Sequence, residues 1–98
     1  MKTLTVLIGN TDNKLTQQQW SRYVHDVDYW LLHYQDDRYF FGGCATWEPF
    51  QNMCWVISIE DERLEMLKDQ LYELCVYFNQ DSMAILVGET EFIKANEP

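Results

Sequence analysis

The sequence is poor in basic residues, and it has no long hydrophobic run. Only seven lysines and arginines stand against sixteen acids, which gives a formal net charge of −9. A field of this sign repels nucleic-acid phosphates and anionic membrane surfaces, so we expect no direct binding to either. No stretch approaches about 20 consecutive apolar residues, which excludes a transmembrane helix.

Cysteine is also scarce. Cys44, Cys54 and Cys75 are odd in number and lack the spacing of a zinc site or a disulfide framework. Each lies in an apolar segment, where a free thiol behaves as a small buried hydrophobe. We therefore expect no metal or other cofactor, no signal peptide before the first strand, and a reducing, cytoplasmic location.

Candidate catalytic and metal-binding residues are also few. Cys44 beside Gly42-Gly43 is the one candidate nucleophile, but it lacks a local histidine. His25 and His33 lie about 12 Å apart along a helix, which is too far for both to bind one metal ion. We expect that the protein is not an enzyme; a small enzyme or ligand binder with a pocket near Cys44 is the less favoured alternative.

Hydrophobic residues make up 47% of the 98 residues and aromatic residues 15%, which is enough for one packed domain. We expect a single domain over 1–98, with 93–98 as a frayed tail. Hydrophobic periodicity predicts strands over 3–8, 38–47, 53–59 and 83–87, and helices over 16–33 and 61–79. The order β-α-β-β-α-β predicts an α+β, ferredoxin-like fold: a four-stranded antiparallel sheet with two helices on one face. The first and third strands should be adjacent in the centre.

The helix over 61–79 carries an unusual charge pattern. Asp61 is expected to cap it, and Asn79 to close it in a left-handed conformation. Its predicted apolar stripe consists of Leu64, Leu67, Leu71, Leu74 and Phe78, widened by Met66, Cys75 and Val76.

On its outer side Glu65, Asp69 and Glu73 follow one another at i, i+4 spacing, and Glu62 extends the row. Like charges at this spacing cost about 0.2–0.5 kcal/mol per pair, so a helix selected only for stability would alternate signs. One interpretation is a solvated face that keeps a small protein soluble. The other is a row of carboxylates presented to a basic partner.

Aromatic residues are concentrated in the predicted hairpin of the second and third strands. Tyr39, Phe40 and Phe41 are consecutive and cannot all point to one side of a strand. One face of this hairpin is uncovered if both helices pack on the other, and exposed aromatics near acids are typical of protein interfaces. Tyr39, Phe41 and Trp47 are therefore candidate protein-binding residues beside the acidic row, and the sequence leaves open which of the two is the contact surface.

In size, charge and expected fold the chain resembles the small acidic DNA mimics that phages use as anti-CRISPR or anti-restriction inhibitors. It equally resembles the immunity proteins that cover nuclease toxins. The resemblance implies a non-enzymatic inhibitor that occupies the nucleic-acid-binding surface of a basic, nucleic-acid-processing partner, in the host cytoplasm if the protein is viral. The alternative from a different functional class is a homo-oligomeric structural domain, such as a homodimer through the uncovered sheet face.

Overall fold

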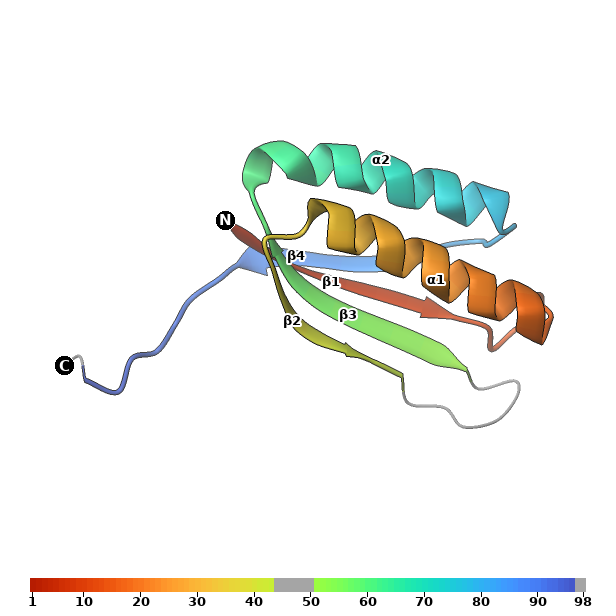
Figure 1. Cartoon of the computed structure of the whole chain (residues 1–98), viewed down its shortest axis with the longest axis horizontal. Helices are drawn as coiled ribbons and strands as arrows, with labels where there is room; N and C mark the ends of the chain where they lie inside the picture. Colours follow the sequence, from red (N-terminus) through yellow and green to blue (C-terminus); the bar gives the residue numbers. More distant parts are fainter. Residues whose placement is uncertain (44–50, 97–98) are drawn as a thin grey trace.

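The computed structural model describes residues 1–43 and 51–96. Its elements follow the order β1 (Lys2–Gly9), α1 (Gln17–Tyr34), β2 (Asp37–Gly42), β3 (Asn52–Ile59), α2 (Asp61–Tyr77) and β4 (Ala84–Glu89). The strands form one antiparallel sheet in the order β2-β3-β1-β4, and both helices lie on the same side of it (Figure 1). The predicted ferredoxin-like α+β fold is therefore confirmed, with β1 and β3 in the centre.

The second and fourth strands differ most from their predicted ranges. β2 ends at Gly42, and the rest of the predicted strand, from residue 44 to 47, lies outside the described residues. β4 continues through Gly88 to Glu89, because the backbone at Gly88 pairs with Thr3 of β1. A neighbouring strand thus keeps a glycine in the sheet where the local sequence predicts an end.

The core lies between the sheet and the helices. Alternating residues of the two central strands face the helices, and their register places Leu4 opposite Ile57 and Val6 opposite Trp55. The buried apolar side chains of the strands and helices are Leu4, Val6, Ile8, Trp55, Ile57 and Ile59 on the sheet, Trp20, Tyr23, Val27 and Leu31 on α1, and Leu64, Leu67 and Leu71 on α2. Because these positions recur with periods of two and about 3.6, each element buries one face.

The start of α1 is held by two sets of hydrogen bonds. The Thr16 hydroxyl accepts from the Gln19 backbone N–H at 3.2 Å, and the Gln19 side-chain oxygen accepts from the Thr16 N–H at 2.9 Å. This is the capping box that S/T-x-x-E/Q sequences form. The buried Asn10 side chain binds both backbone groups of Leu15, each at 3.0 Å, and so fixes the loop from β1 into the helix.

The two ends of α2 differ in how they are capped. Glu60, not Asp61, is the N-cap residue, and it makes no side-chain capping bond; the prediction of Asp61 as the cap was wrong by one residue. At the other end Asn79 has a φ of 55°, as predicted. The Asn79 N–H binds the Val76 carbonyl at 3.0 Å and the next N–H binds the Cys75 carbonyl at 2.9 Å, which is the Schellman arrangement.

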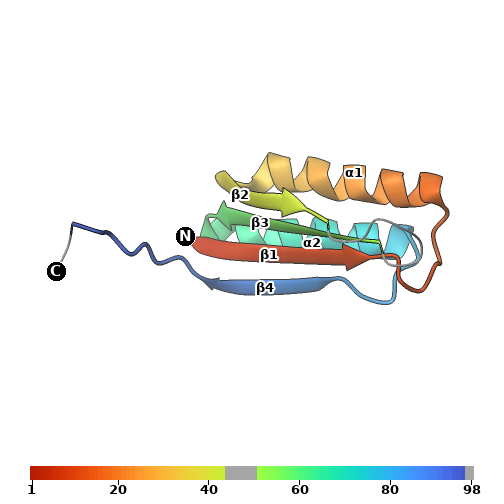
Figure 2. The same ribbon diagram turned by 90° about the horizontal axis from the view of Figure 1, so that it is seen from below.

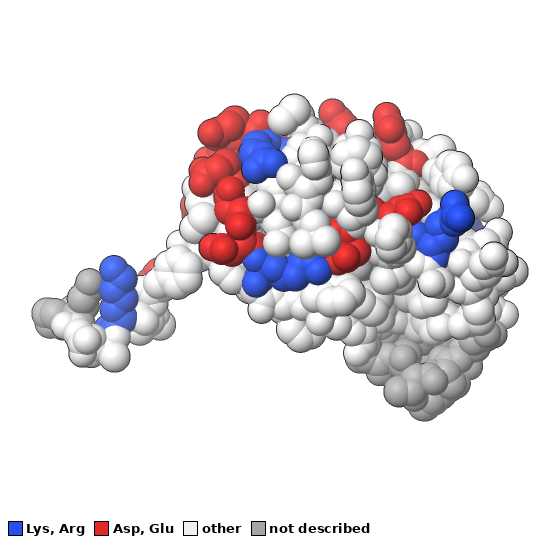
Figure 3. All heavy atoms as spheres, in the orientation of Figure 1, with Lys and Arg blue, Asp and Glu red and all other residues white. Residues whose placement is uncertain are grey.

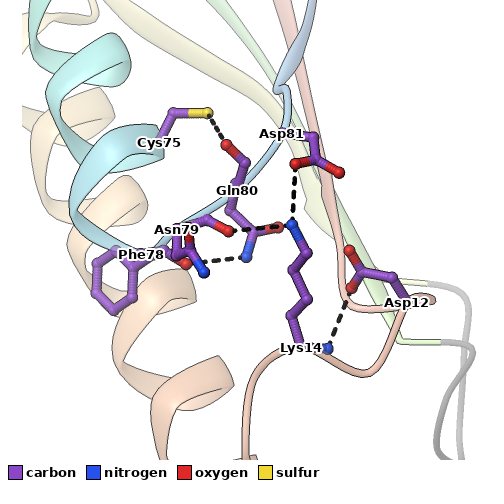
Figure 4. A network of polar contacts seen from close by, with 7 residues as sticks. All are labelled: Asp12, Lys14, Cys75, Phe78, Asn79, Gln80 and Asp81. Carbon is purple, nitrogen blue, oxygen red and sulfur yellow. Dashed lines mark hydrogen bonds and ion pairs between the residues drawn. The ribbon is translucent and has the colours of Figure 1, made fainter.

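The loop after α2 is tied to the loop after β1 by Lys14 (Figure 4). The Lys14 Nζ donates to Asp81 Oδ1 at 2.9 Å and to the Asn79 carbonyl at 3.5 Å, while the Lys14 backbone N–H donates to Asp12. The hydrogen bond from Asp81 raises the pKa of Lys14 above its ordinary value. This contact joins two loops at the end of the sheet where β1 ends and β4 begins.

The side of the sheet opposite the helices is called the open face here, and its prominent side chains are Thr5, Leu7, Tyr39, Phe40, Val56 and Leu86. Figure 2 shows no described helix or strand on this side. A bulge between Arg38 and Phe40 inserts Tyr39 as an extra residue in β2. Gly43, just after β2, lies close to the backbone of β3, because a Cβ on Gly43 would lie 2.3 Å from the Asn52 carbonyl oxygen.

Candidate protein-binding surface

The four predicted acidic residues of α2 are all exposed on its outward side. The apolar residues at steps of three and four face the core, so Glu62, Glu65, Asp69 and Glu73 are turned to solvent. Four residues of helix rise about 6 Å, which is the spacing of successive carboxylates from Glu65 to Glu73. In Figure 3 acidic side chains are densest at the end of the molecule where α2 begins.

Basic side chains do little to neutralise this row. Between residues of the described part of the chain, lysines and arginines form ion pairs with Glu89, Asp81, Asp28, Asp36 and Glu65. Of the row, only Glu65 is among them, with Lys68 at 3.3 Å. No described lysine or arginine lies within 4.0 Å of Glu62, Asp69 or Glu73.

The other basic residue of α2 points away from the row. The Arg63 Nη2 donates to the backbone carbonyl of His33 at 2.9 Å, and its guanidinium lies 5.6 Å from the centre of the Tyr34 ring. Its Nη1 is 4.0 Å from Asp36. Arg63 therefore joins α2 to the end of α1 and leaves the outward carboxylates unpaired.

Large apolar side chains lie next to the acidic row, and none of them was among the predicted site residues. Tyr72 and Tyr77 are 70% and 73% exposed. Met66 and Val76 are also exposed, so the prediction that they widen the buried stripe was wrong. At 3.6 residues per turn both positions rotate to the outward side, away from Leu67 and its neighbours. The helical period alone could have identified them.

A groove of about 450 Å³ runs between α2 and β4, and its lining includes Tyr72, Val76, Cys75, Met83 and Ile85. The Cys75 Sγ donates to the Gln80 carbonyl at 3.4 Å (Figure 4). Burial, with a smaller contribution from the nearby Asp81, raises the pKa of the Cys75 thiol. A raised thiol pKa lowers the thiolate fraction, so this cysteine is a packing residue of the groove rather than an activated nucleophile.

The predicted aromatic part of the site does not join the acidic part. Tyr39 lies on the open face, whereas the Phe41 ring lies on the helix side with its centre 5.6 Å from that of Trp55. Trp47 lies outside the described residues. The sheet therefore separates Tyr39 from the acidic row of α2, while Phe41 lies on the helix side, at the edge strand β2.

Phe41 belongs to a structural network that the sequence did not reveal. The Asp28 Oδ1 accepts from Arg38 Nη1 at 2.7 Å and from the Trp55 indole N–H at 2.9 Å. The Arg38 guanidinium also lies 5.1 Å from the centre of the Phe41 ring. This network joins α1 to β2 and satisfies the indole of a fully buried tryptophan. Its residues are 10 and 27 positions apart along the chain, so no local pattern signals it.

Other kinds of site find no support in the described residues. Within 1–43 and 51–96 no cluster of three or more His, Cys, Asp or Glu side chains could hold a metal ion. No helix in the same part is both long and apolar enough to cross a membrane. No protein-family model matches the chain, and no curated protein sequence matches it.

Proposed function

We propose that this protein is a non-enzymatic inhibitor that binds the nucleic-acid-binding surface of a basic protein through the outward face of α2. The observation that carries the proposal is the composition of that face. It combines three unpaired carboxylates, on Glu62, Asp69 and Glu73, with the exposed rings of Tyr72 and Tyr77.

The carboxylates supply the charge that a phosphate-binding surface recognises. From Glu65 through Asp69 to Glu73 they are spaced by about 6 Å, which is of the order of the distance between phosphates along a nucleic-acid strand, so they can meet lysines and arginines that otherwise bind phosphates. Complementary charge chiefly accelerates association, and salt weakens it. The tyrosines supply the apolar contact area that charge lacks, since aromatic side chains carry much of the binding energy of protein interfaces.

The test uses a triple variant, Glu65→Gln, Asp69→Asn and Glu73→Gln. Its fold should be retained, because the two i, i+4 repulsions that it relieves and the exposed Glu65–Lys68 ion pair that it removes are each worth only about 0.2–0.5 kcal/mol. A matched control, Asp26→Asn, Asp37→Asn and Glu91→Gln, also removes three charges but leaves α2 unchanged.

The three proteins are immobilised and exposed to host-cell extract, and bound protein is then released with duplex DNA. The wild type and the control should retain the same basic partner, DNA should compete it off, and the triple variant should lose it mainly through slower association. Retention by the triple variant at an unchanged rate and salt dependence would remove α2 as the recognition surface. A captured nuclease whose active site is covered would assign the chain to the immunity-protein alternative.

A further inference from the structure

The open face of the sheet is the other unusual surface of this molecule. Phe40 and Leu86 project from it and are more than half exposed, and Tyr39 lies beside them. The two helices occupy the opposite side of the sheet (Figure 1). An exposed apolar patch that spans four strands is larger than a scattering of single surface hydrophobes, and such patches mark interaction sites.

The charge of this face distinguishes it from the rest of the molecule. The register gives β1 and β3 four open-face positions each and β4 three, and none of the eleven carries a charge: Thr3, Thr5, Leu7, Gly9, Asn52, Cys54, Val56, Ser58, Ala84, Leu86 and Gly88. Asp37, at the start of the edge strand β2, is the acid nearest to them in the register. In a chain with a net charge of −9, the acidic residues are thus kept off the centre of this face. Carboxylates lie only at its margins: Asp37 at one edge, and Glu89 and Glu91 in the lining of the hollow beside the end of β4.

We propose that the open face is a self-association surface, on which two copies of this chain pack sheet against sheet about a twofold axis. This proposal is independent of the function assigned to α2. The inferred partner is a second copy of the chain, because this face allows two acidic molecules to meet without bringing their acidic rows together. Contact through the helix layer would bring one acidic row against the other, whereas contact through the open face opposes its uncharged centre and keeps Asp37, Glu89 and Glu91 at the margins.

Sheet-to-sheet packing also places the acidic helices far apart. Two stacked sheets are about 10 Å apart and each helix layer adds about 10 Å, so the two α2 helices would be separated by about 30 Å. The Debye length is about 8 Å at physiological ionic strength, so the repulsion between the two rows is largely screened at that distance.

The flat area of the face is about half of what a specific dimer interface buries on each partner, and two further features add to it. Strands about 4.8 Å apart and six to eight residues long give a face of about 19 by 23 Å, or about 430 Å² before its relief is counted. A specific interface buries about 800 Å² on each partner. Side-chain relief adds to the flat area, and so does the segment after β4, where Phe92 is exposed beside the face.

The surface shape of the open face, with a hollow and projecting side chains, is suited to a twofold contact. A hollow of about 610 Å³ lies between Tyr39 and Phe92, and its lining includes the small residues Thr3, Thr5 and Gly88. A Cβ added at Gly88 would meet no atom within 4 Å. Because the same face carries both this hollow and projecting side chains, each copy can insert a side chain of its partner, which is the self-complementarity that a twofold interface needs.

The test compares two leucines of similar exposure. Leu86, on the open face, is 57% exposed, and Leu32, on the outer side of α1, is 53% exposed. Leu86→Lys and Leu32→Lys therefore make the same chemical change and reduce the net negative charge equally. Sedimentation equilibrium at protein concentrations up to about 0.1 mM measures the dissociation constant of any dimer in the micromolar range or tighter.

The wild type and Leu32→Lys should sediment as dimers of the 11.8 kDa chain. Leu86→Lys should raise the dissociation constant by at least about a hundredfold, because twofold symmetry buries two lysines without partners. Phe40→Lys, on the opposite edge strand, should do the same. A monomeric wild type, or dimers that survive Leu86→Lys, would overturn the proposal. Dimers lost in Leu86→Lys but kept in Phe40→Lys would indicate pairing through the β4 edge instead, and would also overturn it.

Discussion

The Tyr23 hydroxyl is the sharpest test of the core, because it is buried without a hydrogen-bond partner. Tyr23 is only 1% exposed, and no group among the described residues accepts from or donates to its oxygen. Its ring packs against Phe78, with centres 4.8 Å apart, and edge-on to Trp20. The ring therefore contributes to the core, while the hydroxyl loses its hydration without compensation.

Replacing Tyr23 with phenylalanine keeps the ring and removes the uncompensated group. An unsatisfied buried polar group costs about 1–3 kcal/mol, so we expect Tyr23→Phe to increase the free energy of unfolding by about 1–2 kcal/mol once the small void is counted. For a domain of this size each kcal/mol corresponds to about 4–8 °C in melting temperature. Tyr77→Phe is the matched control: its ring is exposed, so its stability should change by no more than about 0.5 kcal/mol.

The same residue gives a pH dependence of definite sign. Burial raises the pKa of Tyr23 well above its ordinary value near 10, with a smaller contribution from Cys75. Above about pH 10 the unfolded chain loses this proton while the folded protein keeps it, so wild-type stability falls as pH rises. Tyr23→Phe lacks this loss. Its advantage over the wild type should therefore widen by about 1.4 kcal/mol per pH unit above about pH 10.

Thermal and urea denaturation of the three proteins, at neutral pH and above pH 10, measure both effects. A Tyr23→Phe variant less stable than the wild type at neutral pH would refute the reasoning, because it would mean that the hydroxyl has a hydrogen-bond partner in solution. A constant difference between variant and wild type above pH 10 would show that the folded protein does not suppress the ionisation of Tyr23.

Two further predictions test the scaffold by thermal unfolding. Asp28→Ala should lower the free energy of unfolding by about 2–3 kcal/mol, because it leaves the Arg38 guanidinium and the Trp55 indole N–H without their shared acceptor; an unchanged melting temperature would mean that this network contributes nothing. Gly43→Ala should destabilise the protein by about 1–3 kcal/mol, because the new Cβ meets backbone at 2.3 Å. Gly88→Ala, into open space, should be neutral or stabilising by up to about 1 kcal/mol, and equal effects of the two alanines would contradict the close approach at Gly43.

The sequence by itself determined the elements of this fold, because the signals that define them act within a few residues. The alternation in β1 and β3 and the three-four spacing of leucines in α2 each specify one buried face. Thr16 with Gln19, and Asn79 after α2, mark helix ends through hydrogen bonds that span no more than five residues. The order of the elements then predicted the sheet. The exposure of Tyr72 and Val76 was available from the same helical period.

Tertiary structure alone decided how the predicted functional residues are distributed. The bulge at Tyr39 places this residue and Phe40 on the open face, while Phe41 turns toward Trp55. The acidic row of α2 lies on the other side of the sheet from Tyr39 and Phe40, which the sequence could not specify. Local pattern specifies which side of an element is apolar. Which sides end up covered, paired or free depends on contacts between residues tens of positions apart, and those exist only once the sheet has formed.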